Sequence, residues 1–254
     1  MPKFKFVKIS KNKKIRYLIN NTSSNIYVVF LHGFKSDLEG DKPKALYEFC
    51  KKKKIGFLAH EYSGHGKSYG KFEDGTITSW TEDTKKIITK KIKNKKLILV
   101  GSSMGGWIGL NLFKSLNKKI LAFVGIAPAP EFLERLMWKN FTDKVKRQLI
   151  KEKIYIFNHG GFDYNISYNL IKDGRKNKIF NKNFKSNIFL TILHGKKDDV
   201  VPISISRKIL NIFKNANKKL ILIKSGDHSL SKKNNLKKLI SEIEIIYNRL
   251  TYKL

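Results

Sequence analysis

A serine flanked by two glycines stands between a predicted strand and a predicted helix, and this junction constrains the fold more than any other feature. The motif is Gly101-x-Ser103-x-Gly105. It follows an apolar strand-like run at 96–100 and opens a segment at 103–116 that we expect to be helical. A sharp strand-to-helix turn lifts the serine hydroxyl clear of the sheet, and small flanking residues leave room for the helix. The motif therefore predicts an α/β fold with an exposed serine hydroxyl.

The rest of the chain alternates predicted strands and helices. Two early strands at 3–9 and 15–19 flank a polar turn and predict an antiparallel hairpin. Apolar runs predict further strands at Ile26–Leu31, Gly56–His60, Ile120–Ile126, 188–193 and 220–223. Helices are expected at 43–53, at 79–93 with Thr78 or Ser79 as the cap and Glu82 completing a capping box, at 134–151, and from 203 and 235. This order predicts a mostly parallel central sheet with helices on both faces.

One domain is expected over residues 1–254, because α/β domains of this length are common. The regular alternation stops at 131 and resumes with the strand at 188. Residues 131–187 are therefore predicted to be a cap or lid insertion over the carboxyl edge of the sheet.

Positive charge dominates the chain, which has 53 Lys and Arg residues against 20 Asp and Glu residues and a formal net charge of +33. Such a charge raises nucleic acid or an anionic membrane as a partner. The cations are nearly all lysines, however, whereas arginine is preferred for recognising phosphates and bases. They are also spread along the chain together with Asn and Ile, as an AT-rich genome would produce. We expect no specific nucleic-acid partner, although a weak attraction to anionic surfaces is compatible with the charge.

The cysteine content and the apolar runs indicate a soluble cytoplasmic protein. Cys50 is the single cysteine, so a disulfide framework is excluded and a reducing compartment fits. The start of the chain alternates lysines with apolar residues and resembles neither a signal peptide nor a transit peptide. No apolar run approaches the roughly 20 residues of a transmembrane helix.

A histidine and a carboxylate that can activate Ser103 follow later in the chain. A serine hydroxyl is a weak nucleophile unless a base takes its proton and an acid orients that base. The candidate base is His228, and the candidate acids are Asp198 and Asp199. General chemistry does not separate these two neighbours on one loop. Asp227 directly precedes the base and is expected to hold its turn instead.

Two backbone N–H groups are expected to form an oxyanion hole. One belongs to Met104, the residue after the nucleophile, and the other to Phe34, which follows the strand Ile26–Leu31. Their side chains are expected to line the acyl pocket. Among the other histidines, three stand next to glycine and are expected to make structural hydrogen bonds: His32, His65 and His194. His60 is expected in or beside the core, and His159 is a candidate for touching substrate.

Four motifs together resemble the α/β-hydrolase superfamily over essentially the whole chain. They are Tyr62-Ser63-Gly64-x-Gly66-x-Ser68, Gly101-Ser102-Ser103-Met104-Gly105-Gly106-Trp107, His194-Gly195-x-x-Asp198-Asp199-x-Val201-Pro202 and Asp227-His228. More narrowly, they are similar to those of the mitochondrial α/β-hydrolase-domain thioesterases and acyl-glucuronide esterases and of their bacterial relatives. The resemblance implies a Ser-Asp-His triad and places the acid at Asp198 instead of Asp199.

The resemblance and the residues together predict a serine hydrolase that cleaves carboxylic esters or thioesters through an acyl-enzyme, with no metal or organic cofactor. The substrate is expected to be a small molecule or an acylated protein. Apolar residues at near-helical spacing suggest an apolar acyl group, and Phe132, Met137 and Trp138 are the candidates for binding it. The same residues can equally form the core of the cap. A peptidase, an acyltransferase or a non-catalytic basic binding module remains an alternative.

Overall fold

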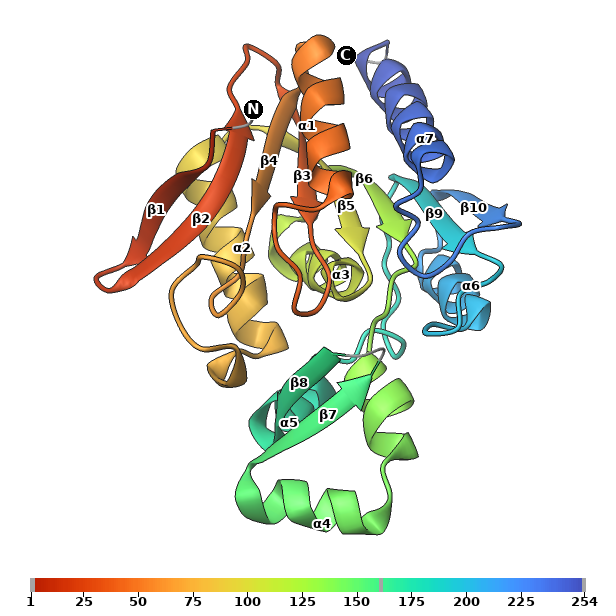
Figure 1. The fold of residues 1–254 in the computed structure, drawn as a ribbon. Coiled ribbons are helices and arrows are strands. Elements are labelled where there is room, and N and C mark those ends of the chain that lie inside the picture. Colours follow the sequence, from red (N-terminus) through yellow and green to blue (C-terminus); the bar gives the residue numbers. More distant parts are fainter. Residues whose placement is uncertain (1–2, 160–161, 253–254) are drawn as a thin grey trace.

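A central sheet of eight strands organises the part of the chain described by the computed structural model, residues 3–159 and 162–252 (Figure 1). The strand order is β1-β2-β4-β3-β5-β6-β9-β10. Pairing is antiparallel from β1 to β2 and from β2 to β4, and parallel between the other neighbours. The strands are β1 (Lys5–Ser10), β2 (Lys13–Asn20), β3 (Ile26–Leu31), β4 (Gly56–His60), β5 (Lys96–Ser102), β6 (Ile120–Ile126), β9 (Phe189–Gly195) and β10 (Asn217–Ile223). The predicted mostly parallel sheet with an N-terminal antiparallel hairpin is confirmed.

Helices cover both faces of this sheet, as predicted. One face is covered by α1 (Asp41–Lys52) and α7 (Lys233–Thr251), which contact each other. The other is covered by α2 (Ile77–Ile92), α3 (Met104–Leu116) and α6 (Ile203–Ile212) (Figure 1). The short helix η1 (Phe72–Asp74) precedes α2.

Strand β3 shows why the sheet is covered on both sides. All six of its residues are buried. Tyr27 and Leu31 belong to the hydrophobic cluster under α2 and α3, whereas Val28 and Phe30 belong to the cluster under α1 and α7. Because side chains alternate along a strand, a continuous apolar run supplies both layers. Each fully buried side chain of this kind contributes about 1.5–3 kcal/mol relative to an exposed one.

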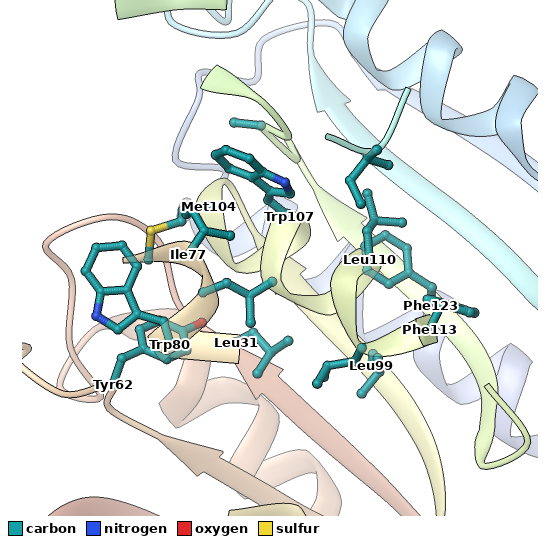
Figure 2. Packing of buried hydrophobic residues seen from close by; sticks show 14 of the residues in the cluster. Leu31, Tyr62, Ile77, Trp80, Leu99, Met104, Trp107, Leu110, Phe113 and Phe123 are labelled. Atoms are coloured by element: carbon teal, nitrogen blue, oxygen red, sulfur yellow. The ribbon is translucent and has the colours of Figure 1, made fainter. Parts of the chain in front are cut away.

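Helix α3 is anchored in the larger cluster directly behind Ser103. Figure 2 shows Met104, Trp107, Leu110 and Phe113 along α3, with Met104 beside Ile77 of α2. Met104, Trp107 and Leu110 are fully buried. This packing fixes the start of α3, and with it the turn that carries Ser103.

The segment between β6 and β9 forms a separate group of elements beyond the carboxyl ends of the parallel strands (Figure 1). Its strands β7 and β8 pair antiparallel in a sheet of their own. The elements are η2 (Leu133–Met137), η3 (Trp138–Asn140), α4 (Asp143–Glu152), β7 (Ile154–His159), β8 (Phe162–Ser167) and α5 (Tyr168–Lys176). The hairpin and α5 were not anticipated from the sequence.

The single helix predicted over 134–151 is wrong. The chain makes a π-helical turn and a 3₁₀ turn, becomes extended at Phe141, and starts a new helix after Thr142. The Thr142 hydroxyl accepts a hydrogen bond from the Val145 amide, so it caps α4 and separates it from the preceding turns.

Several other predicted boundaries move by two or three residues, and for two of them the cause is visible. Helix α2 begins at Ile77, two residues earlier than expected, because Thr76 and Ser79 form a reciprocal capping box. The box predicted between Ser79 and Glu82 is therefore wrong. Strand β10 begins at Asn217 instead of 220, because its first residues pair with β9 despite being exposed. Within the described residues, no helix has the length and apolar character needed to cross a membrane.

Candidate active site

Ser103 occupies the turn between β5 and α3 with a positive φ of 50° and a ψ of −117°. This region of backbone space is sparsely populated by residues other than glycine, so the turn is strained. Hydrogen bonds hold it in place. The Ser103 amide donates to the Ile126 carbonyl at 2.9 Å, and the Ser103 carbonyl accepts from the Ala129 amide at 3.0 Å.

The two glycines of the motif are required by close backbone contacts. A Cβ atom added to Gly105 would lie 2.1 Å from the Leu31 carbonyl oxygen, and one added to Gly101 would lie 2.6 Å from the Gly105 carbonyl oxygen. Only glycine therefore lets α3 pass this close to β3 and β5.

A hydrogen-bonded chain of three side chains runs through the site. The His228 Nε2 atom lies 3.0 Å from the Ser103 hydroxyl oxygen, and His228 Nδ1 lies 2.9 Å from Asp198 Oδ2. Ser103 is at the end of β5, Asp198 follows β9, and His228 is on the loop after β10. The three residues predicted as nucleophile, acid and base are thus brought together from the carboxyl ends of three parallel strands.

The side chain of Asp198 is buried and surrounded by N–H groups. Its Oδ1 atom accepts hydrogen bonds from the Val200 and Val201 amides, at 2.9 and 2.8 Å. Its Oδ2 atom faces two imidazoles, His228 and, at 3.1 Å, His194. Burial of the carboxylate opposes its charge, but the hydrogen bonds from His194, His228 and Val201 outweigh this and hold the pKa of Asp198 well below its usual range. The group is therefore ionised at neutral pH.

The two other aspartates considered for the acid lie elsewhere. Asp199 is exposed at the rim of the cavity described below. Asp227 accepts a hydrogen bond from the Leu230 amide at 2.8 Å and so holds the turn that carries His228, in line with its expected role.

The two residues expected to supply oxyanion donors belong to segments that lie beside Ser103. Met104 is the first residue of α3, where the backbone N–H groups have no acceptor within the helix. Phe34 follows Gly33, and a Cβ atom added to Gly33 would lie 3.6 Å from Ser103 Cβ. The Phe34 ring is packed on several sides by aromatic rings, those of Phe72, Trp80, Phe132 and Tyr164.

Three buried histidines cluster around Tyr62, close to the loop that carries Phe34. The His32 and His65 rings are 5.1 Å apart, and both lie beside Tyr62, whose hydroxyl donates to the His32 carbonyl. The Lys35 amide donates to His65 Nε2 at 3.3 Å. Burial lowers the pKa of His32 and His60, and it lowers that of His65 to about 4. These three histidines are therefore neutral at physiological pH and have a structural role. The side chain of His159, the candidate for touching substrate, lies outside the described residues.

A cavity of about 1140 Å³ opens over Ser103 and His228. One part of its lining is apolar and includes the predicted residues Phe34, Phe132 and Met137. Leu136, Phe157 and Tyr164 join them from the segment between β6 and β9. Of these, Phe157 and Tyr164 were missed by the sequence analysis, although the run of β-branched and aromatic residues at Ile154-Tyr155-Ile156-Phe157 is typical of a strand. The Met104 side chain, also expected to line the acyl pocket, is fully buried in the core and does not line the cavity.

Another part of the lining is polar. The Lys42 ammonium group donates to the Ser229 carbonyl at 2.5 Å and to the Ser231 hydroxyl at 2.9 Å, and all three residues line the cavity. Burial lowers the pKa of Lys42. Because Ser229 directly follows His228, the ammonium group braces the loop that carries the imidazole.

Trp138 is not among the described residues that line the cavity. Its ring lies 5.9 Å from that of Tyr168, and the Arg175 guanidinium stacks 4.7 Å from its centroid. Its position thus does not support the expected substrate contact. Within the described residues, no group of three or more His, Cys, Asp or Glu side chains is arranged to hold a metal ion.

Sequence and structure comparisons agree on the family. Residues 22–160 match the family described as serine aminopeptidase, S33. The human mitochondrial palmitoyl-protein thioesterase ABHD10 is 28% identical over 228 residues, which cover 88% of this chain and 74% of the relative.

Two known structures resemble the whole fold. Mouse α/β-hydrolase domain-containing protein 10 superimposes with a TM-score of 0.87 at 25% identity, covering 98% of this chain and 99% of the other. A protein of Agrobacterium vitis S4 superimposes with a TM-score of 0.89 at 27% identity, covering 97% of this chain and 98% of the other. The chain therefore belongs to the serine aminopeptidase S33 family and is an α/β-hydrolase related to ABHD10.

Proposed function

We propose that this chain is a serine hydrolase that cleaves carboxylic esters or thioesters through an acyl-enzyme. The observation that carries the proposal is the hydrogen-bonded chain from Ser103 through His228 to the buried Asp198, at the base of an open cavity. The names of the related proteins, a thioesterase and further esterases or lipases, support the same class of reaction.

In the first half of the reaction, the Ser103 hydroxyl oxygen attacks the substrate carbonyl carbon while His228 Nε2 takes the hydroxyl proton. The oxyanion that forms accepts hydrogen bonds from the Phe34 and Met104 amides. Each such donor contributes roughly 10²- to 10³-fold in rate. His228 then gives its proton to the leaving oxygen or sulfur, the bond to the carbonyl carbon breaks, and an alcohol or thiol departs.

In the second half, a water molecule attacks the acyl-enzyme carbonyl while His228 takes one of its protons. The bond to Ser103 breaks, the serine oxygen regains a proton from His228, and the carboxylic acid leaves. Asp198 stays ionised throughout, holds the imidazole in one tautomer and stabilises its positive form.

The two parts of the cavity suit different parts of such a substrate. The leaving group must lie beside His228, which protonates it. The polar lining is there too, because Ser229 and Ser231 are on the His228 loop and Lys42 of α1 donates hydrogen bonds to both. The acyl group then lies against the apolar lining, where Phe132 and Met137 are supplied by the segment 131–187. In this proposal that segment acts as a cap within a single domain. The substrate is a small molecule or an acylated protein, which supplies the oxygen or sulfur of the leaving group.

The compartment proposed for this reaction is the cytoplasm. Cys50 is buried and free, which fits a reducing environment. The mammalian relatives carry a mitochondrial designation in their names, and the reaction proposed here is compatible with either setting.

A substrate panel tests the proposal. Wild type and Ser103→Ala are assayed with acyl esters and acyl thioesters of increasing chain length, and with an aminoacyl amide, because the family description names an aminopeptidase. Hydrolysis of esters or thioesters by wild type alone is expected. Cleavage of the amide alone would replace the esterase assignment with a peptidase, and equal rates for the two proteins would remove Ser103 from the mechanism.

A further inference from the structure

A second histidine contacts the carboxylate of Asp198 from the side opposite the solvent. His194 lies in β9, is fully buried, and its Nε2 atom is 3.1 Å from Asp198 Oδ2. The same nitrogen lies 2.8 Å from the Val201 carbonyl oxygen. Val201 in turn donates its amide hydrogen to Asp198 Oδ1 at 2.8 Å. The imidazole therefore touches both the acid and the turn that shapes it.

The partners of His194 determine where its proton lies. Nε2 faces two acceptors, a carbonyl oxygen and an ionised carboxylate, so this nitrogen must carry a hydrogen. Nδ1 lies 2.7 Å from the hydroxyl of Ser206, a fully buried residue of α6. In the neutral ring, Nδ1 accepts the hydrogen bond that Ser206 donates. The network is thus satisfied with His194 uncharged and in a single tautomer.

We propose that His194 is a positioning residue for the hydrolytic reaction, holding the Asp198 carboxylate in the orientation that receives His228. The inference rests on the proposed function. Two imidazole N–H groups share Oδ2, so the ring of His194 fixes Asp198 from behind while His228 approaches from the cavity side. His194 touches no reacting atom and acts only through Asp198 and Val201.

The position of His194 also has an electrostatic consequence. Its N–H group draws negative charge toward itself, which weakens the attraction between Asp198 and protonated His228. Removing the donor should therefore strengthen this attraction and move the acid limb of the rate profile to higher pH. The charged groups near the His228 loop, Lys42 and Asp227, are unaltered by changes at His194.

Two amide variants separate this role from simple packing. In His194→Gln the amide nitrogen reaches about as far as ring Nε2 and can still donate toward Val201 and Asp198. In His194→Asn the amide reaches only the position of Nδ1, so the contact with Ser206 can persist while the donor to the turn is lost. Both variants replace the ring by an uncharged amide, which makes them matched controls for each other.

The test compares kcat, KM, the pH profile and the rate of labelling by a fluorophosphonate for wild type and both variants, with circular dichroism to verify folding. We expect kcat to fall about 10²-fold in His194→Asn, the order of loss that a misplacement near 1 Å produces. KM should change little, the acid limb should move to higher pH, and His194→Gln should recover most of the loss. Equal losses in both variants, or a wild-type kcat and acid limb in His194→Asn, overturn the proposal.

Two further outcomes keep the test decisive. If His194→Asn does not fold, Ser206→Ala removes the outer hydrogen bond instead; a smaller fall in kcat at unchanged KM is then expected, and an unchanged kcat overturns the proposal. Failure of wild type to react with the fluorophosphonate would refute the proposed function itself. Wild-type labelling together with unimpaired labelling of His194→Asn would refute only the role of His194.

Discussion

The Nε2 atom of His228 lies 3.0 Å from the hydroxyl oxygen of Ser103, although the two residues are 125 positions apart in the chain. Parallel strands bring them together, because β5 and β10 both end at the same edge of the sheet. The contact is of hydrogen-bonding length, so in the proposed mechanism His228 can take the Ser103 proton from this position.

Neighbouring aspartates provide a direct comparison for the acid. In Asp198→Asn, the buried group can no longer stabilise a positive His228, and kcat should fall by up to about 10⁴-fold, the size of effect known for a triad acid. Asp199→Asn changes an exposed side chain one position away and should leave kcat nearly unchanged. Steady-state kinetics of both variants check this, and a larger loss in Asp199→Asn would move the acid to that residue.

The strained turn at Ser103 predicts that glycine at this position makes the folded protein more stable than alanine does. Glycine adopts a φ of 50° freely, whereas alanine does not, so Ser103→Gly should unfold at a higher urea concentration than Ser103→Ala. The expected difference is about 1 kcal/mol, the lower end of the cost of such a backbone conformation. Both variants should be inactive. Equal midpoints for the two would show that the turn is not strained.

The buried histidines predict a loss of stability in acid. Their pKa values in the folded protein are lower than in the unfolded chain, so the unfolded chain binds more protons as the pH falls below about 6.5. Stability from His65 is thus fully present above that pH and is lost toward its folded pKa of about 4.

Replacing one of these histidines should reduce this dependence. In His65→Phe the free energy of unfolding should fall less steeply between pH 6 and 4 than in wild type, by about 1 kcal/mol per pH unit. Urea unfolding at several pH values measures the two slopes. Identical slopes would mean that His65 is not buried in its neutral form.

The cavity lining predicts that acyl-chain preference depends on Met137 and not on Trp138. Met137→Ala enlarges the apolar part of the cavity and should shift kcat/KM toward longer acyl chains, by about tenfold or more for each methylene that becomes accommodated. Trp138→Ala removes a larger side chain that packs on Tyr168 and Arg175, so the preference should persist. A shift in Trp138→Ala equal to that in Met137→Ala would return Trp138 to the substrate site.

The parallel core could be predicted because its physical causes are local. A continuous apolar run such as Ile26–Leu31 suits only a strand covered on both faces, and the glycines around Ser103 suit only a tight strand-to-helix turn. Ser103, Asp198 and His228 each follow a predicted parallel strand, so all three could be expected at the carboxyl edge of the sheet.

The segment between β6 and β9 was less predictable because tertiary contacts decide its structure. Apolar spacing suggested one long helix through Trp138, yet the cap at Thr142 restarts the helix. The contact between His194 and Asp198 was also missed. Its only sequence signal is that His194 and Asp198 are four residues apart in one motif. This spacing does not specify the direction of either side chain.

The identity of the residue modified by a fluorophosphonate tests the central claim most directly. Mass spectrometry of the digested wild-type protein should locate a single phosphonyl group on Ser103, with no adduct in Ser103→Ala and slow labelling in His228→Ala. A wild-type protein that stays unmodified, or an adduct on any residue other than Ser103, would contradict the account.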